Sequence, residues 1–227
     1  MRFVTDLSKG ILGKPDSTEL WSEVISCIPD EVFLRKDVKV LNVAFGHTTE
    51  ADIIVKRMLS LGRTPADIKD SIYLLDKYSV FTKDAMRKGY THVIQADFME
   101  WEADMKFDIV IGNPPYQDKK GNENSTNSAD LYTKFINKSF ELTKDYVAMI
   151  IPSAWSGPRN SNIKQTIFED NQPTIFNTHG KKWFDVEMNT CYFISQKGRQ
   201  GPTEITDAHG NKIVKTLSKE SVITTDL

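Results

Sequence analysis

Several features are scarce in this sequence of 227 residues. It contains two cysteines and four histidines, and no apolar run approaches the roughly 20 residues that a membrane-spanning helix needs. Cys27 and Cys191 are far apart in apolar surroundings, which favours buried thiols over a disulfide or a metal site. The first residues show no signal-peptide core. We therefore expect a cytoplasmic protein that binds no metal and has no membrane partner.

An excess of charge of one sign is also absent. There are 29 Lys and Arg residues against 31 Asp and Glu, so the net charge is −2 and the pI is about 6.1. The chain therefore has no overall excess of basic residues that would indicate nucleic-acid binding, although a local basic patch is compatible with this composition. The fractions of hydrophobic (39%) and charged (26%) residues are those of a globular protein with one good core and at most a small appendage.

Strand and helix patterns alternate along most of the chain. Buried-strand patterns occur at 37–45, 71–76, 92–96, 107–111, 146–151, 174–177 and 190–196. Helical spacing of apolar residues occurs at 17–28, 50–61, 79–88, 130–143 and 162–171. A hairpin turn is predicted at 208–211. The alternation predicts an α/β sandwich with a mostly parallel sheet and helices on both faces.

The most informative stretch joins a predicted strand to a proline-rich loop. The strand at 107–111 stops at Gly112 and is followed by Asn113, Pro114, Pro115 and Tyr116. Neither proline can donate a backbone hydrogen bond, and each has a fixed φ angle. The loop is therefore stiff and rich in acceptors, namely the Asn113 side-chain oxygen and the carbonyls of Asn113 and Pro114. A flat group with N–H donors could bind there with Tyr116 against its face, which predicts a reaction centre for an exocyclic amine.

An acidic strand end and a long polar segment accompany this loop. Asp76 ends a predicted strand about one βαβ unit after the end of the first strand, where an acid usually binds ribose hydroxyls. Residues 117–129 are polar and show no periodicity. Their position directly after the predicted reaction centre favours a lid or a substrate-binding loop over a solvated insertion.

The order of these features resembles that of a known family. Strand ends with Asn42, Asp76 and Asp97, followed by the loop at 113–116, resemble those of class I S-adenosylmethionine-dependent amino-methyltransferases. The chain is most similar to the N6-adenine DNA methyltransferases of restriction–modification systems and phages, from about residue 37 to 197. Supporting segments are Asp97-Phe98, the helix with Leu131, Tyr132 and Phe135, and residues 151–155 and 183–186. A single short motif is weak, whereas several in the same order are a stronger signal.

The resemblance implies a fold, a cofactor and roles for individual residues. It implies a Rossmann-like class I methyltransferase domain at 37–197, with an N-terminal helical segment at 1–36 and a short C-terminal extension at 198–227. The cofactor would be S-adenosylmethionine, with Asp76 on its ribose, Asp97 on its adenine amino group and Phe98 against the adenine ring. Ala44 and Gly46 would border its methionine part. The implied cofactor-binding residues are Asn42, Ala44, Phe45, Gly46, Asp76, Asp97 and Phe98, and the implied catalytic residues are Asn113, Pro114, Pro115 and Tyr116.

The implied substrate is the N6 amine of an adenine flipped out of DNA. DNA is therefore the expected partner, and a separate specificity subunit is a second expected partner. Because the same loop also serves other planar amines, RNA adenine, cytosine N4 and protein glutamine are alternative substrates. Asn42 stands where the family usually has an acid, and Thr48 where it usually has glycine. These two departures motivate a different alternative, a degenerate methyltransferase fold that acts as a binding or subunit protein.

Overall fold

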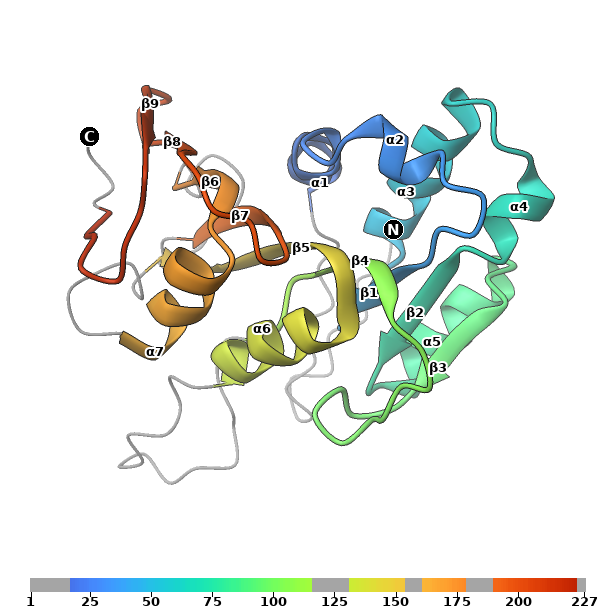
Figure 1. Ribbon diagram of the computed structural model, residues 1–227. Coiled ribbons are helices and arrows are strands. Elements are labelled where there is room, and N and C mark those ends of the chain that lie inside the picture. Colours follow the sequence, from blue (N-terminus) through green and yellow to red (C-terminus); the bar gives the residue numbers. More distant parts are fainter. Residues whose placement is uncertain (1–16, 116–130, 154–160, 179–189, 224–227) are drawn as a thin grey trace.

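Nine strands form one sheet in the computed structural model, which describes residues 17–115, 131–153, 161–178 and 190–223. Their order in the sheet is β3-β2-β1-β4-β5-β7-β6-β8-β9 (Figure 1). The first five strands in this order, β3, β2, β1, β4 and β5, are all parallel to their neighbours among them. Strand β7 is antiparallel to both β5 and β6, β8 is parallel to β6, and β9 is antiparallel to β8. The strands are β1 Val40–Val43, β2 Ile72–Asp76, β3 His92–Gln95, β4 Phe107–Gly112, β5 Thr143–Pro152, β6 Pro173–Asn177, β7 Thr190–Gln196, β8 Thr203–Thr206 and β9 Lys212–Lys215.

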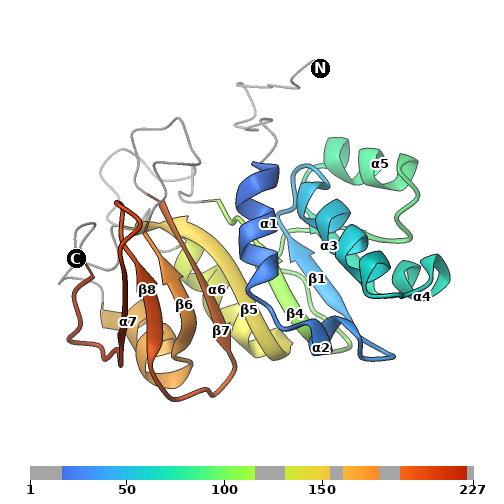
Figure 2. The same cartoon turned by 90° about the horizontal axis from the view of Figure 1, so that it is seen from above.

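Helices cover both faces of this sheet. Figure 2 shows α1 and α3 on one face and α6 and α7 on the other. Two hydrophobic cores correspond to the two faces, one containing residues of α1, α3 and α5 and the other residues of α6 and α7. The helices are α1 Thr18–Ser26, α2 Asp30–Phe33, α3 Thr49–Ser60, α4 Pro65–Lys69, α5 Ser79–Arg87, α6 Leu131–Leu142 and α7 Ser161–Lys164, which continues into a π-helix at Gln165–Asp170.

The central strands are buried on both faces because their side chains alternate between the two cores. In β1, Val40 packs in the core with α3, whereas Leu41 and Val43 pack in the core with α6. All four residues of β1 and all six residues of β4 are buried. Strands covered on both faces are apolar over most of their length, with Asn42 in β1 and Asp108 in β4 as polar exceptions, and this apolar pattern located them in the sequence.

The predicted α/β fold class with a mostly parallel sheet is confirmed. The structure adds short helices α2 and α4, which the sequence analysis did not predict, and part of the helix expected at 162–171 is a π-helix. The hairpin predicted at 208–211 is present as β8 and β9. Since β8 pairs with β6, part of the predicted C-terminal extension continues the same sheet. The division of the chain at residues 36 and 197 stays a prediction.

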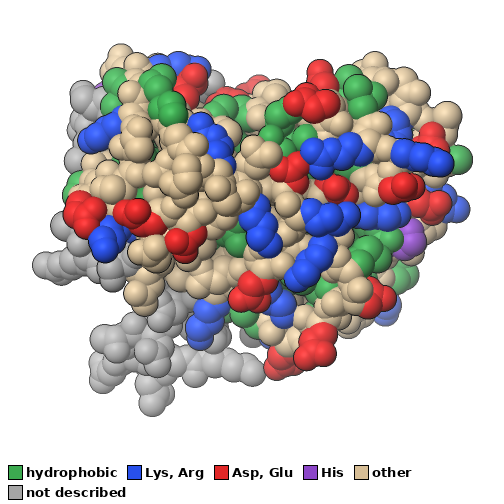
Figure 3. Space-filling view, in the orientation of Figure 1, with side chains coloured by type: hydrophobic (Ala, Val, Ile, Leu, Met, Phe, Trp, Pro, Cys, Tyr) green, Lys and Arg blue, Asp and Glu red, His purple; other side chains and the backbone are tan. Residues whose placement is uncertain are grey.

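Surface charge is mixed on the face seen in Figure 3, where acidic and basic side chains are interspersed. Within the four described ranges, no helix is both long and apolar enough to cross a bilayer. Several predicted features lie outside those ranges: Tyr116, the loop at 117–129, Trp155 and the segment at 183–186.

Candidate active site

The predicted site residues leave the sheet at one edge. Strands β1, β2, β3 and β4 are parallel, and Val43 at the end of β1 is in register with Leu75 and Gly112 on its two neighbours. The loop after β1 and the loop after β4 therefore start side by side, with Asp76 next to them at the end of β2. In α/β sheets of this kind ligands bind beyond the carboxyl ends of the strands.

The loop after β1 turns through two residues in the left-handed region. Ala44 and Gly46 both have φ of +52°, and Ala44 is the only non-glycine residue of the described chain with positive φ. The loop is tied to β2 by hydrogen bonds from Ala44 N–H to the Leu75 carbonyl at 2.9 Å and from Gly46 N–H to Asp76 Oδ2 at 3.0 Å. A Cβ placed on Gly46 would have no heavy atom of the described residues within 4 Å. The loop is thus held firmly at its base, and the described part of the chain leaves space beside Gly46.

Thr48, which replaces the usual glycine, fits this loop without strain. Its φ is −84°, in a region open to every residue, and its side chain is buried. Its hydroxyl donates to Asp52 Oδ2 at 2.9 Å and accepts from Lys88 Nζ at 2.6 Å. Tyr90 donates to the other Asp52 oxygen at 2.6 Å. The threonine side chain therefore belongs to a polar network that joins α3 to the end of α5.

Asp76 is almost fully buried and holds two backbone amides. Its Oδ2 accepts from Gly46 N–H, and its Oδ1 accepts from Tyr78 N–H at 2.8 Å. Burial raises the pKa of this carboxyl group, although both amide hydrogen bonds oppose that shift. A carboxylate oxygen has two lone pairs, so each oxygen that binds an amide retains one acceptor site for a hydroxyl.

Asp97 begins a turn after β3 and is partly exposed. Its Oδ1 accepts from Met99 N–H at 3.0 Å, and its Oδ2 accepts from Lys77 Nζ at 2.7 Å. Lys138 on α6 fixes the same turn, donating to the carbonyls of Met99 at 3.1 Å and Trp101 at 2.5 Å. The hydrogen bond with Asp97 raises the pKa of the Lys77 ammonium. Neither lysine was identified from the sequence, although the position of Lys77 directly after Asp76 was a usable signal.

Three of the predicted cofactor residues are buried below this edge. Phe98 is 2% exposed and its ring packs 4.8 Å from that of Phe135 in the core, so its contact with an adenine ring stays a prediction. Phe45 is 3% exposed in the opposite core. Asn42 is fully buried, and among the described residues neither its Oδ1 nor its Nδ2 has a hydrogen-bond partner. A buried amide with both ends unsatisfied is rare in a folded protein and calls for a specific explanation.

The loop after β4 approaches β1 closely because Gly112 has no side chain. A Cβ on Gly112 would lie 2.3 Å from the Val43 carbonyl oxygen and 2.9 Å from Val43 Cγ2. Asn113 follows directly and is half-buried, Pro114 is buried and Pro115 is exposed. The close approach brings the start of the predicted acceptor loop against the base of the loop at Ala44–Gly46.

The mostly parallel sheet with helices on both faces is the class I methyltransferase fold. A Listeria monocytogenes protein described as a class I S-adenosylmethionine-dependent methyltransferase has a similar structure, with a TM-score of 0.61 at 13% identity over 80% of this chain and 59% of that chain. The DNA-bound ATP-dependent Type ISP restriction-modification enzyme LlaBIII is similar with a TM-score of 0.64 at 14% identity, over 91% of this chain and 20% of that chain. At these identities the likeness concerns the fold.

The family follows from the sequence match. Residues 46–184 match the Eco57I restriction-modification methylase family, and the chain belongs to that family. A curated relative from Mycoplasma pneumoniae, described as an uncharacterized adenine-specific methylase, is 33% identical over 123 residues. That match covers 48% of this chain and 28% of the relative, so the chain corresponds to a little over a quarter of the relative's length.

Proposed function

We propose that this chain transfers a methyl group from S-adenosylmethionine to the N6 amine of adenine in DNA. The observation that carries the proposal is the register of Val43 with Gly112. It sets the loop that would hold the methyl donor beside the loop that would hold the amine. In this reaction the two reactants must be aligned, and holding both at one edge removes much of the entropic part of the barrier.

The residues at this edge fit the proposed cofactor. Gly46 opens onto free space, where a ligand can approach the backbone closely. Asp76 and Asp97 offer carboxylate oxygens at the ends of adjacent strands, suited to hydroxyl and amino donors respectively. The unsatisfied amide of Asn42 would gain a partner from a polar ligand group or a water bound with it. The cofactor itself would supply an electrophilic methyl group on a sulfonium.

The acceptor loop has the chemistry to activate an aromatic amine. The Asn113 side-chain oxygen and the Pro114 carbonyl would accept from the two N–H groups of adenine N6. Fixed acceptors stabilise the positive charge that develops on this nitrogen as it is alkylated, in the same way that fixed donors stabilise an oxyanion. Pro115 would keep the loop stiff, and Tyr116, outside the described residues, would stack on the base for about 1–3 kcal/mol.

DNA is the proposed substrate for two reasons. The Mycoplasma pneumoniae relative is described as adenine-specific, and LlaBIII, which shares the fold, is bound to DNA. An adenine amine inside a duplex cannot reach an enclosed site, so the base would be flipped out of the helix. Sequence choice would come from the loop at 117–129 or from a separate specificity subunit.

Methyl transfer measured with labelled cofactor tests the proposal. The wild-type chain is expected to label adenine-containing DNA, with N6-methyladenine as the nucleoside identified by mass spectrometry. Asn113→Ala should reduce the rate by about 100-fold or more, because one charge-stabilising group is lost. Asn137→Ala, a matched change at an exposed asparagine of α6, should leave the rate unchanged.

Parallel reactions with RNA and with protein separate the alternative substrates. Labelling of RNA or protein in preference to DNA would replace DNA as the substrate while keeping the chemistry. A wild-type rate in Asn113→Ala would remove the proposed role of the acceptor loop. Absence of cofactor binding would remove the enzymatic proposal and favour a binding or subunit protein.

A further inference from the structure

An ion pair spans the ends of β2 and β3 at the proposed cofactor site. Lys77 is the first residue after β2, and Asp97 lies two residues beyond β3, its parallel neighbour. Lys77 Nζ lies 2.7 Å from Asp97 Oδ2, with the lysine side chain 55% exposed and the aspartate side chain 30% exposed. This cation therefore contacts the carboxylate that the proposed cofactor needs for its adenine amine.

Two donors to Asp97, the Met99 amide and the Lys77 ammonium, differ in how easily they can leave. The Met99 amide, on Oδ1, belongs to a turn whose carbonyls are held by Lys138 from α6. Lys77 reaches Oδ2 at the end of a flexible, half-exposed side chain. Oδ2 retains a second acceptor site, so an amine bound there would crowd the lysine and weaken or displace its hydrogen bond, whereas the Met99 hydrogen bond can persist.

We propose that Lys77 lowers the affinity of this site for its cofactor by competing with the adenine amine for Asp97 Oδ2; this inference rests on the proposed function. An ammonium is a stronger donor to a carboxylate than a neutral amine, so part of the cofactor's binding free energy offsets the loss of the ion pair. The pair is partly exposed, so the effect is modest: removal of the lysine charge should tighten binding about two- to fivefold.

The competition has two signatures that a merely structural lysine would not produce. Salt screens a partly exposed ion pair, so the advantage of a variant without the lysine should shrink between about 0.05 M and about 0.5 M salt. A ligand without the 6-amino group has no donor to exchange for the lysine. Its affinity should therefore not improve when Lys77 is replaced.

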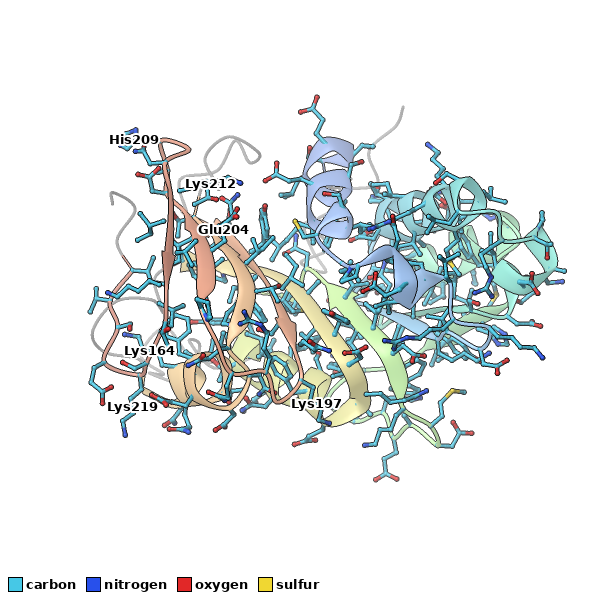
Figure 4. The ribbon with its side chains drawn as sticks, turned by 45° about the horizontal axis from the view of Figure 1, so that its top comes forward. Lys164, Lys197, Glu204, His209, Lys212 and Lys219 are labelled. Atoms are coloured by element: carbon cyan, nitrogen blue, oxygen red, sulfur yellow. The ribbon has the colours of Figure 1, made fainter. Side chains whose placement is uncertain are left out.

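Calorimetric titration with S-adenosylhomocysteine, which binds without turnover, provides the measurement. The test variants are Lys77→Met, which removes the charge at similar length, and Lys77→Arg, which keeps it. The matched control is Lys212→Met, because Lys212 makes a similar exposed pair with Glu204, also at 2.7 Å, in the C-terminal hairpin (Figure 4). The second ligand is the analogue of S-adenosylhomocysteine with hydrogen in place of the 6-amino group.

At low salt, we expect Lys77→Met to have a roughly two- to fivefold lower Kd for S-adenosylhomocysteine than the wild type, and an unchanged Kd for the analogue. Lys77→Arg and Lys212→Met should bind like the wild type. Equal affinity of Lys77→Met and wild type would overturn the inference, and weaker binding would make Lys77 a ligand instead of a competitor. Absence of binding in every variant would overturn the proposed function itself, and is distinguishable because the wild type would then also fail.

Discussion

Lys88 donates a hydrogen bond from Nζ to the Thr48 hydroxyl at 2.6 Å, and the same hydroxyl donates to Asp52. Thr48, which stands where the family usually has glycine, therefore has a structural function of its own. It joins the start of α3 to the end of α5 directly behind the loop at Ala44–Gly46. The departure is compatible with an intact loop, because the left-handed turns fall on Ala44 and Gly46 and Thr48 has negative φ.

Replacement of Thr48 by glycine should lower the stability of the protein without raising its affinity for the cofactor. Thr48→Gly removes the hydroxyl from Asp52 and Lys88 and should lower the free energy of unfolding by about 1–3 kcal/mol, measured by urea denaturation. Thr48→Ser, which keeps the hydroxyl, should lose less. The affinity for S-adenosylhomocysteine should stay within error of the wild type in both. A clearly tighter complex in Thr48→Gly would mean that the threonine obstructs the cofactor.

Gly112→Ala tests the close approach of β4 to β1. The added Cβ would meet the Val43 carbonyl at 2.3 Å, so the strand ends must separate, at a cost of about 1–3 kcal/mol in unfolding free energy. Since Asn113 follows directly, methyl transfer should fall as well. Gly62→Ala is the contrasting change, because its Cβ meets nothing within 4 Å and only the positive φ is unfavourable. It should destabilise the fold with no effect on transfer; equal effects of the two changes on transfer would refute the argument.

Asn42→Leu separates stability from cofactor binding. Leucine has the same number and branching of side-chain heavy atoms as asparagine and carries no polar atoms, so the unsatisfied amide is removed from the core. We expect the unfolding free energy to rise by about 1–3 kcal/mol in urea denaturation. Titration with S-adenosylhomocysteine should show weaker binding if the amide serves the cofactor. Asn42→Asp is the opposite case and should destabilise the free protein at neutral pH, because burying an unpaired carboxylate is costlier than burying an amide. Lower stability in Asn42→Leu would show that the amide has a partner in solution.

Lys164 predicts a pH dependence of stability. Its side chain is 2% exposed, on α7, and donates to the Ser221 carbonyl at 2.6 Å (Figure 4). Burial lowers the pKa of this ammonium below its ordinary 10.5. Because the pKa of Lys164 is lower in the folded state, the folded state is favoured at pH values above the ordinary pKa. This contribution to stability is lost as the pH falls through the lowered pKa.

The wild type should therefore gain stability relative to Lys164→Met as pH rises toward 10.5. Urea denaturation of both proteins between about pH 7 and about pH 10 measures this difference. Two curves that stay parallel over the interval would show that Lys164 titrates alike in the folded and unfolded states.

The sequence predicted the strands well and their surroundings poorly. Strands β1, β2 and β4 are apolar over most of their length because both faces are covered, so their hydrophobic pattern identified them, and parallel pairing then sets Asp76 and Asn113 at one edge. The strand at 190–196 was predicted, but the hydrophobic pattern does not indicate strand direction, so the antiparallel pairing of β7 with β5 was not. Helices α2 and α4 are too short to show a helical period.

Side-chain partners were the part of the site that the sequence did not reveal. The pair of Lys77 with Asp97 and the network around Thr48 join residues 20 and 40 positions apart, respectively, through tertiary contacts. The contact of Phe98 with the adenine ring stays a prediction, and the sequence did not reveal that this ring packs against Phe135 of α6. The sequence thus located the strand ends, while the fold determines which of their side chains face the edge.

The position of β6 in the sheet has a consequence for synthesis on the ribosome. Its two neighbours in the described sheet, β7 and β8, both follow it in the chain. Strand β4, in contrast, can pair with β1 as soon as it emerges. The nascent chain therefore exposes both edges of β6 until β7 has been translated, and one edge until β8 ends at Thr206, and open edges recruit other chains. The half of the sheet that carries Asp76 and Asn113 can assemble first, and the half that carries neither is where a stalled or shortened chain would aggregate.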